Sequence, residues 1–235
     1  APLLATKLHV PPVRQRLVAR EDLVERLQEG FKAGHRASVV SAAAGFGKTT
    51  LLGEWIQNIS YPAAWLALDE ADSDPTRFLT YLTASLKTLQ PDLGAGVLTA
   101  VQAPQHSPFE ALLATLINEI AALPERMILV LDDYHTIQSP DVDSLLAFFV
   151  EQLPPQLHLV LASREDPPLP MARLRAHGWV TEIRAADLRF SSEEAAVFLN
   201  QVMGLNLSVE EAAALTARTE GWAAGLQLAA LSLQR

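Results

Sequence analysis

The chain has 235 residues with a net charge of −9, and 49% of them are hydrophobic. This suits one large domain, or a domain with a small satellite, around a real core. The acidic balance argues against direct nucleic-acid contact, which favours basic surfaces. No apolar stretch approaches the roughly 18 residues of a membrane span, no secretion signal is visible, and cysteine is absent, so we expect a cytoplasmic protein away from membranes.

Apolar runs alternate with helical stretches over most of the chain, which predicts an α/β fold with a parallel sheet. The predicted strands are Ala37–Ala43, Ala63–Leu68, Met127–Leu131, Leu157–Ala162 and Trp179–Ile183. A capping residue followed by proline predicts helix starts at Asp74-Pro75, Ser107-Pro108 and Ser139-Pro140.

Beyond Leu188 only helix signals remain. Capping boxes begin at Ser191 and Ser208, and a third helix is expected from near Gly221 through Leu233. The sequence therefore predicts a nucleotide-binding domain over residues 1–187, including an N-terminal segment 1–36, and a small all-α helical domain over 188–235.

A glycine-rich motif, Ala44-Gly45-Phe46-Gly47-Lys48-Thr49-Thr50, follows the first predicted strand and opens a helix. This is the context of a P-loop, whose backbone N–H groups and helix N-terminus cradle phosphates. Lys48 would hold the β- and γ-phosphates of ATP, and Thr49 would bind Mg²⁺. The full pattern has glycine where this chain has Ala42. The alternative is an ordinary glycine-rich turn with a solvated lysine.

Two later strands end in groups that suit the same ligand. Asp132 follows Leu131 and is placed to hold Mg²⁺ opposite Thr49, and Asp133 could orient the attacking water. The alternative for the pair is a turn cap after a core strand. Arg164 follows the next strand and could sense the γ-phosphate or stabilise charge in the transition state; the alternative is a surface salt bridge.

Three other groups are interpreted structurally. The acidic residues Asp69, Glu70, Asp72 and Asp74 are expected to form a solvated loop, with a metal site as the alternative. His135 is expected to pack in its loop, with proton transfer as the alternative. Arg173 and Arg175 are expected to be surface charges, or arginine fingers toward a neighbouring subunit.

Several motifs together resemble one family of ATPases. They are the P-loop, Arg16-Leu17-Val18-Ala19-Arg20, Trp65-Leu66-Ala67-Leu68-Asp69, Leu131-Asp132-Asp133-Tyr134-His135, Leu161-Ala162-Ser163-Arg164, Leu188-Arg189-Phe190-Ser191 and Gly221-Trp222-Ala223-Ala224-Gly225-Leu226. In this order they resemble the signal-transduction ATPases with numerous domains (STAND), and within them the MalT-like (LuxR-type) transcriptional regulators.

The resemblance implies five parallel strands with the P-loop strand central. It places Val18 and Arg20 against adenine, and the helical domain over the base through Gly221–Ala223, where the wider class often has proline at the position of Ala223. It further implies a switch with slow ATPase activity. A closed monomer would hold ADP, and ATP would favour opening and self-association. Winged-helix, helical-repeat sensor and DNA-binding helix-turn-helix domains would lie elsewhere in such a protein.

Two other functions are compatible with these motifs. A P-loop kinase would need an acceptor pocket and an arginine-rich lid, and no lid sequence is visible. An interaction scaffold would keep the nucleotide only as a structural ligand.

Overall fold

The computed structural model describes residues 3–12, 16–103 and 107–234. Five parallel strands form one sheet in the order β2-β3-β4-β1-β5. The strands are β1 (Ala37–Ser41), β2 (Ala63–Ala67), β3 (Met127–Asp132), β4 (Leu157–Ser163) and β5 (Val180–Arg184). The predicted fold class is confirmed. The expectation of a central P-loop strand is wrong, because β4 takes the middle place and β1 lies between β4 and β5.

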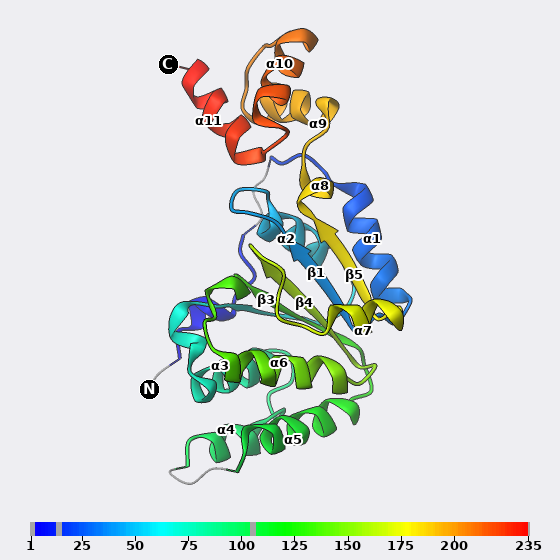
Figure 1. Ribbon diagram of the computed structural model, residues 1–235, viewed down its shortest axis with the longest axis vertical. Helices are drawn as coiled ribbons and strands as arrows, with labels where there is room; N and C mark the ends of the chain where they lie inside the picture. The colour runs from blue at the N-terminus through cyan, green and yellow to red at the C-terminus, as the bar shows by residue number, and fades with distance from the viewer. Residues whose placement is uncertain (1–2, 13–15, 104–106, 235) are drawn as a thin grey trace.

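The sheet is covered on both faces, as the apolar strands predict. Leu129 and Leu131 of β3 pack into the cluster under α3, α5 and α6, while Ile128 and Val130 pack against α1 and α2. Figure 1 shows these layers. The helices around the sheet are α1 (Glu21–Lys32), α2 (Lys48–Asn58), α3 (Pro75–Lys87), α4 (Ala95–Val101), α5 (Phe109–Ala121), α6 (Pro140–Gln152), α7 (Met171–Ala176) and α8 (Ala185–Leu188).

Local capping chemistry sets several helix starts. Asp74 accepts from the N–H of Arg77 at α3, and Ser139 does the same for Val142 at α6, with proline next in both cases. At α5 the helix begins at Phe109 with Pro108 as its N-cap, one residue later than the sequence predicts.

The end of the chain forms a small helical satellite above the sheet (Figure 1). It contains α9 (Ser192–Val197), the π-helical turn η4 (Phe198–Val202), α10 (Val209–Thr219) and α11 (Ala223–Leu233). Both predicted capping boxes form, at Ser191 and Ser208. The satellite has its own apolar cluster around Leu199 and Leu226, which Val18 of the N-terminal segment joins. The division at Leu188 stays a prediction.

The expectation of a solvated acidic loop after β2 is wrong for its central residue. Asp72 lies in the short helix η2 (Glu70–Ser73) and is fully buried, where it pairs with Lys7 of η1 (Ala5–Leu8) and with Arg77 of α3. Lys7 also pairs with Asp69 at 3.0 Å. A buried carboxylate needs such partners, so these carboxylates tie the N-terminal segment to the sheet. No three acidic or histidine residues in the described ranges are grouped so as to hold a metal ion.

None of the helices in the described part of the chain combines the length and apolar character that a bilayer crossing requires.

A buried histidine gives the fold a testable dependence on pH. His158 of β4 lies between the Ser38 hydroxyl at 2.9 Å and the His35 carbonyl at 2.8 Å. Burial lowers the pKa of His158 to about 4. The unfolded chain keeps a pKa near 6.5 and so binds more protons between those values. The stabilisation is therefore complete above pH 6.5 and is lost as the pH falls toward 4.

We expect the wild-type free energy of unfolding to fall between pH 7 and pH 5 by about 2 kcal/mol more than that of His158→Gln. Urea denaturation at both pH values measures this difference. His177→Gln, which changes an exposed histidine, is the control and should follow the wild type. Parallel pH curves for the wild type and His158→Gln would contradict the assignment.

Candidate functional site

The P-loop lies between the end of β1 at Ser41 and the start of α2 at Lys48. Gly45 and Gly47 have φ of +79° and +81°, the left-handed region that favours glycine. Within the described residues, no protein group accepts from the backbone N–H of Gly45, Phe46 or Gly47. Consecutive free amides beside a helix N-terminus form a site for phosphate oxygens. The strand, loop and helix predicted from the sequence are all present.

Lys48 lies inside this loop rather than in solvent. The residue is only 7% exposed, and Nζ donates to the carbonyls of Ala42 at 2.6 Å and Ala43 at 3.1 Å. Burial lowers the pKa of Lys48, while the charges of Asp133 and Asp132 oppose that shift. The ammonium group is therefore held at the mouth of the loop, beside both carboxylates.

Thr49 and Asp132 face each other across the site. The Thr49 hydroxyl donates to Oδ2 of Asp132 at 2.9 Å, and the other carboxylate oxygen accepts from the N–H of Asp133 at 3.0 Å. Asp132 is 3% exposed, and burial together with the nearby charge of Asp133 raises its pKa. A bound cation would compensate a carboxylate in this position, so the pair fits the oxygen ligands that Mg²⁺ prefers.

Asp133 differs from Asp132 in its setting. Its backbone is left-handed, with φ of +58°, and its side chain is half exposed at the start of η3 (Tyr134–Thr136). His135 lies beside it, with Nδ1 at 3.8 Å from Oδ1 of Asp133. Burial lowers the pKa of His135, and so does the positive charge of Arg164.

Arg164 follows β4 and is exposed. Ser163 pairs with Ser41 where β4 and β1 end, so Arg164 lies at the same edge of the sheet as the P-loop, and its charge lowers the pKa of Lys48. The structure thus brings Lys48, Thr49, Asp132, Asp133 and Arg164 together at the carboxyl ends of β1, β3 and β4, where ligands of parallel sheets bind.

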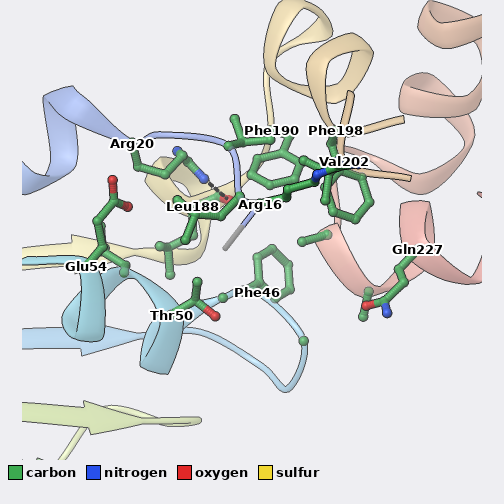
Figure 2. Close-up of a pocket in the computed structure, with 17 residues that line it drawn as sticks. Arg16, Arg20, Phe46, Thr50, Glu54, Leu188, Phe190, Phe198, Val202 and Gln227 are labelled. Carbon is green, nitrogen blue, oxygen red and sulfur yellow. Dashed lines mark hydrogen bonds between the residues drawn. The ribbon is translucent and has the colours of Figure 1, made fainter. Parts of the chain in front are cut away.

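A pocket of about 230 Å³ adjoins the P-loop on the side of the satellite. Figure 2 shows Phe46 projecting from the loop toward Phe190 and Phe198, with Thr50 and Glu54 of α2 to its left. The rings of Phe190 and Phe198 are 5.6 Å apart. An apolar space walled by aromatic rings and open to a phosphate loop suits a planar base.

The predicted adenine contacts Val18, Arg20 and Ala223 all line this pocket. The guanidinium of Arg20, however, is engaged elsewhere. It donates to the carbonyls of Leu188 at 3.0 Å and Asp187 at 2.7 Å and pairs with Glu194 of α9 at 2.9 Å. Burial lowers the pKa of Arg20. The Arg20 side chain therefore holds the N-terminal segment against the link between sheet and satellite. A contact between Arg20 and a bound base would involve its aliphatic stem or its backbone, since the guanidinium group is already paired.

The sequence did not single out part of the pocket wall. Phe198, Val202 and Gln227 come from the satellite, and Phe190 precedes it. Phe190 belongs to the motif Leu188-Arg189-Phe190-Ser191, on which the family resemblance partly rests. That its ring points into the pocket depends on packing, which the sequence does not reveal. Arg173 and Arg175 are surface residues paired with Glu151 and Glu182, as the favoured interpretation predicts.

Comparison with known proteins places this geometry in a family. The AAA ATPase domain model matches residues 16–162. The chain is 33% identical over 233 residues to the HTH-type transcriptional regulator MalT of Cronobacter sakazakii, covering 99% of this chain and 26% of that protein. It is 34% identical over 236 residues to the serine/threonine-protein kinase PknK of Mycobacterium tuberculosis, covering 99% of this chain and 21% of that protein.

Solved structures agree on the fold. A STAND protein with a tetratricopeptide-repeat sensor from Pyrococcus horikoshii matches with a TM-score of 0.60 at 18% identity, covering 93% of this chain and 30% of that one. The resemblance to MalT-like STAND ATPases noted from the sequence is confirmed. The chain spans about a quarter of the length of the curated relatives it matches.

Proposed function

The chain belongs to the AAA ATPase domain family, and from this membership we propose that it is an ATP/ADP-binding switch module with slow ATPase activity. One observation carries the proposal. Free P-loop amides, a buried lysine and the Thr49–Asp132 pair converge at one edge of the sheet, beside a pocket of the size and character for a base. Each group supplies a different part of nucleotide recognition.

The phosphates would be held by the P-loop from Ala44 to Thr50, with Lys48 as the point charge. Thr49 and Asp132 would hold Mg²⁺, which supplies charge neutralisation between phosphate oxygens when bound. Asp133 is assigned to orient the attacking water, because its carboxylate is half exposed and close to Lys48. Arg164 would contact the γ-phosphate.

The adenine would lie in the aromatic pocket, against Val18, the stem or backbone of Arg20, and Ala223. Because this pocket is formed by both the sheet region and the satellite, the ligand contributes to holding them together. A nucleotide that binds the closed form better than the open one shifts the balance between them.

We assign ADP to the closed monomer and ATP to an open form that self-associates. Slow hydrolysis of ATP to ADP would return the open form to the closed one. The relatives named as HTH-type transcriptional regulators favour an output through DNA binding outside this chain. The family resemblance of the sequence adds winged-helix and helical-repeat sensor domains to this proposal. The relative named as a protein kinase matches over the same stretch. The nucleotide switch is the function that both kinds of relative can share.

The direct test is to denature the purified protein and identify the nucleotide it releases by chromatography. We expect ADP in close to equimolar amount, or, after stripping, tight rebinding of ADP with slow ATP hydrolysis. Absence of both released nucleotide and measurable affinity for ADP or ATP would refute the proposal and favour a scaffold. Fast phosphate transfer to a small acceptor would favour a kinase.

A further inference from the structure

The start of α11 lies directly on the P-loop. The indole Nε1 of Trp222 donates to the carbonyl of Ala44 at 2.9 Å, and the N–H of Ala224 donates to the carbonyl of Gly45 at 3.1 Å. Figure 1 places this end of α11 above the loop that precedes α2. Two consecutive P-loop carbonyls are thus held by two donors of the satellite.

Three glycines make this close approach possible. A Cβ on Gly45 would lie 2.5 Å from Cβ of Ala224 and 2.8 Å from Nε1 of Trp222. A Cβ on Gly225 would lie 2.7 Å from Cε3 of Trp222, and one on Gly221 would lie 2.5 Å from the carbonyl oxygen of Phe190. The Gly-Trp-Ala-Ala-Gly motif therefore has a steric role, which is to seat the indole against the loop.

The peptide geometry links this contact to the phosphate site. The carbonyl of Ala44 and the N–H of Gly45 belong to one planar peptide unit, and the carbonyl of Gly45 and the N–H of Phe46 belong to the next. The N–H side of both units is free of protein acceptors within the described residues. A peptide group whose carbonyl accepts a hydrogen bond is polarised and becomes a better donor.

We propose that Trp222 is a positioning residue that couples docking of the satellite to the phosphates, acting through the peptide units of the P-loop and not through the base. The inference rests on the proposed nucleotide site. Docked α11 fixes and polarises the two units that face the phosphate. By linkage, phosphate on the loop strengthens the docking of α11 to the same extent.

The test compares the affinities of ADP and adenosine, measured by calorimetry in the presence of Mg²⁺. The ratio of the two affinities isolates the contribution of the phosphates, because opening of the pocket alone would lower the affinity for ADP and for adenosine by the same factor. In Trp222→Phe, which keeps an aromatic ring but lacks the N–H, we expect the ADP-to-adenosine affinity ratio to fall about three- to tenfold, the size of one lost hydrogen bond. An unchanged ratio would overturn the proposal.

Trp179→Phe is the matched control. Trp179 precedes β5, and its carbonyl accepts hydrogen bonds from the N–H groups of Arg36 and Ala37 at the start of β1, so it lies at the edge of the sheet opposite the P-loop. The ADP-to-adenosine affinity ratio of Trp179→Phe should equal that of the wild type. An equal fall of this ratio in Trp179→Phe and Trp222→Phe would contradict the assignment to Trp222. Wild-type protein that binds neither ADP nor pyrophosphate would instead refute the nucleotide site itself.

A second variant separates coupling from loss of helix stability. Gly225→Ala should favour α11 intrinsically, since alanine is the better helix former, yet its Cβ displaces the Trp222 ring. We expect the affinity ratio to fall here too. Reciprocally, pyrophosphate should slow hydrogen exchange of the Ala224 amide in the wild type and less so in Trp222→Phe. Equal protection in both proteins would contradict the coupling.

Discussion

Replacing Lys48 by alanine is expected to weaken ADP binding by about 100-fold or more and to remove ATP hydrolysis with it. The ammonium group lies in the mouth of the P-loop on the carbonyls of Ala42 and Ala43, beside the two strand-end carboxylates. A charge-assisted contact to phosphate from this position is among the strongest single contacts available to the ligand. Calorimetric titration with ADP, and phosphate release from ATP, measure the two losses.

Controls must separate the lost charge from damage to the loop, because Lys48 is buried and bonded to it. Lys48→Met keeps the apolar stem without the ammonium group and should lose affinity as Lys48→Ala does. Lys32→Ala removes an exposed lysine at the end of α1 and should bind ADP as the wild type does. Wild-type affinity in Lys48→Met would show that the amine does not hold the phosphates.

The P-loop could be predicted from sequence because its chemistry is local. Lys48 and Thr49 come directly after the glycines, and the helix start that orients them is encoded in the same few residues. Asp132 could be added because the carboxyl ends of parallel strands share one edge of the sheet. The position of β1 in the sheet could not be deduced in this way, and the expected central place proved wrong since strand order depends on how long-range segments pair.

The ion pairs of Asp72 could not be predicted from the sequence, because they join residues that are far apart along the chain. Four acidic residues between Asp69 and Asp74 look like a solvated loop, because a run of carboxylates is costly to bury. Lys7 lies 65 residues from Asp72 in the sequence, and only the fold brings them together. Non-local charge pairing therefore buries Asp72, while Asp69, Glu70 and Asp74 are exposed as expected.

The aromatic wall of the pocket was missed for a related reason. Phe198 sits among apolar residues at helical spacing, which is equally typical of a helix core. Its ring joins the satellite cluster and also lines the pocket, so packing alone decides its second role. The Gly221–Gly225 motif, in contrast, was visible in the sequence, but its contact with the P-loop required the structure.

Among changes that leave nucleotide binding intact, we expect the largest effect on hydrolysis at Asp133. Asp132 is committed through both oxygens, to the Thr49 hydroxyl and to a backbone N–H. Asp133 is half exposed, and its negative charge opposes the lowering of the Lys48 pKa that burial causes. Its carboxylate is therefore the one free to orient water at the terminal phosphate. We expect Asp133→Asn to slow ATP hydrolysis by about 10²- to 10⁴-fold, the range for a lost general base.

ADP affinity should change little in the same variant, which separates catalysis from binding. Asparagine tolerates the left-handed backbone that residue 133 adopts, so the turn into η3 should persist, and the two hydrogen bonds from Thr136 to its carbonyl do not involve the side chain. Asp141→Asn, on an exposed turn of α6, is the control and should hydrolyse ATP at the wild-type rate. Wild-type hydrolysis in Asp133→Asn would remove this residue from the mechanism while leaving the Lys48 and Asp132 assignments intact, because those rest on binding.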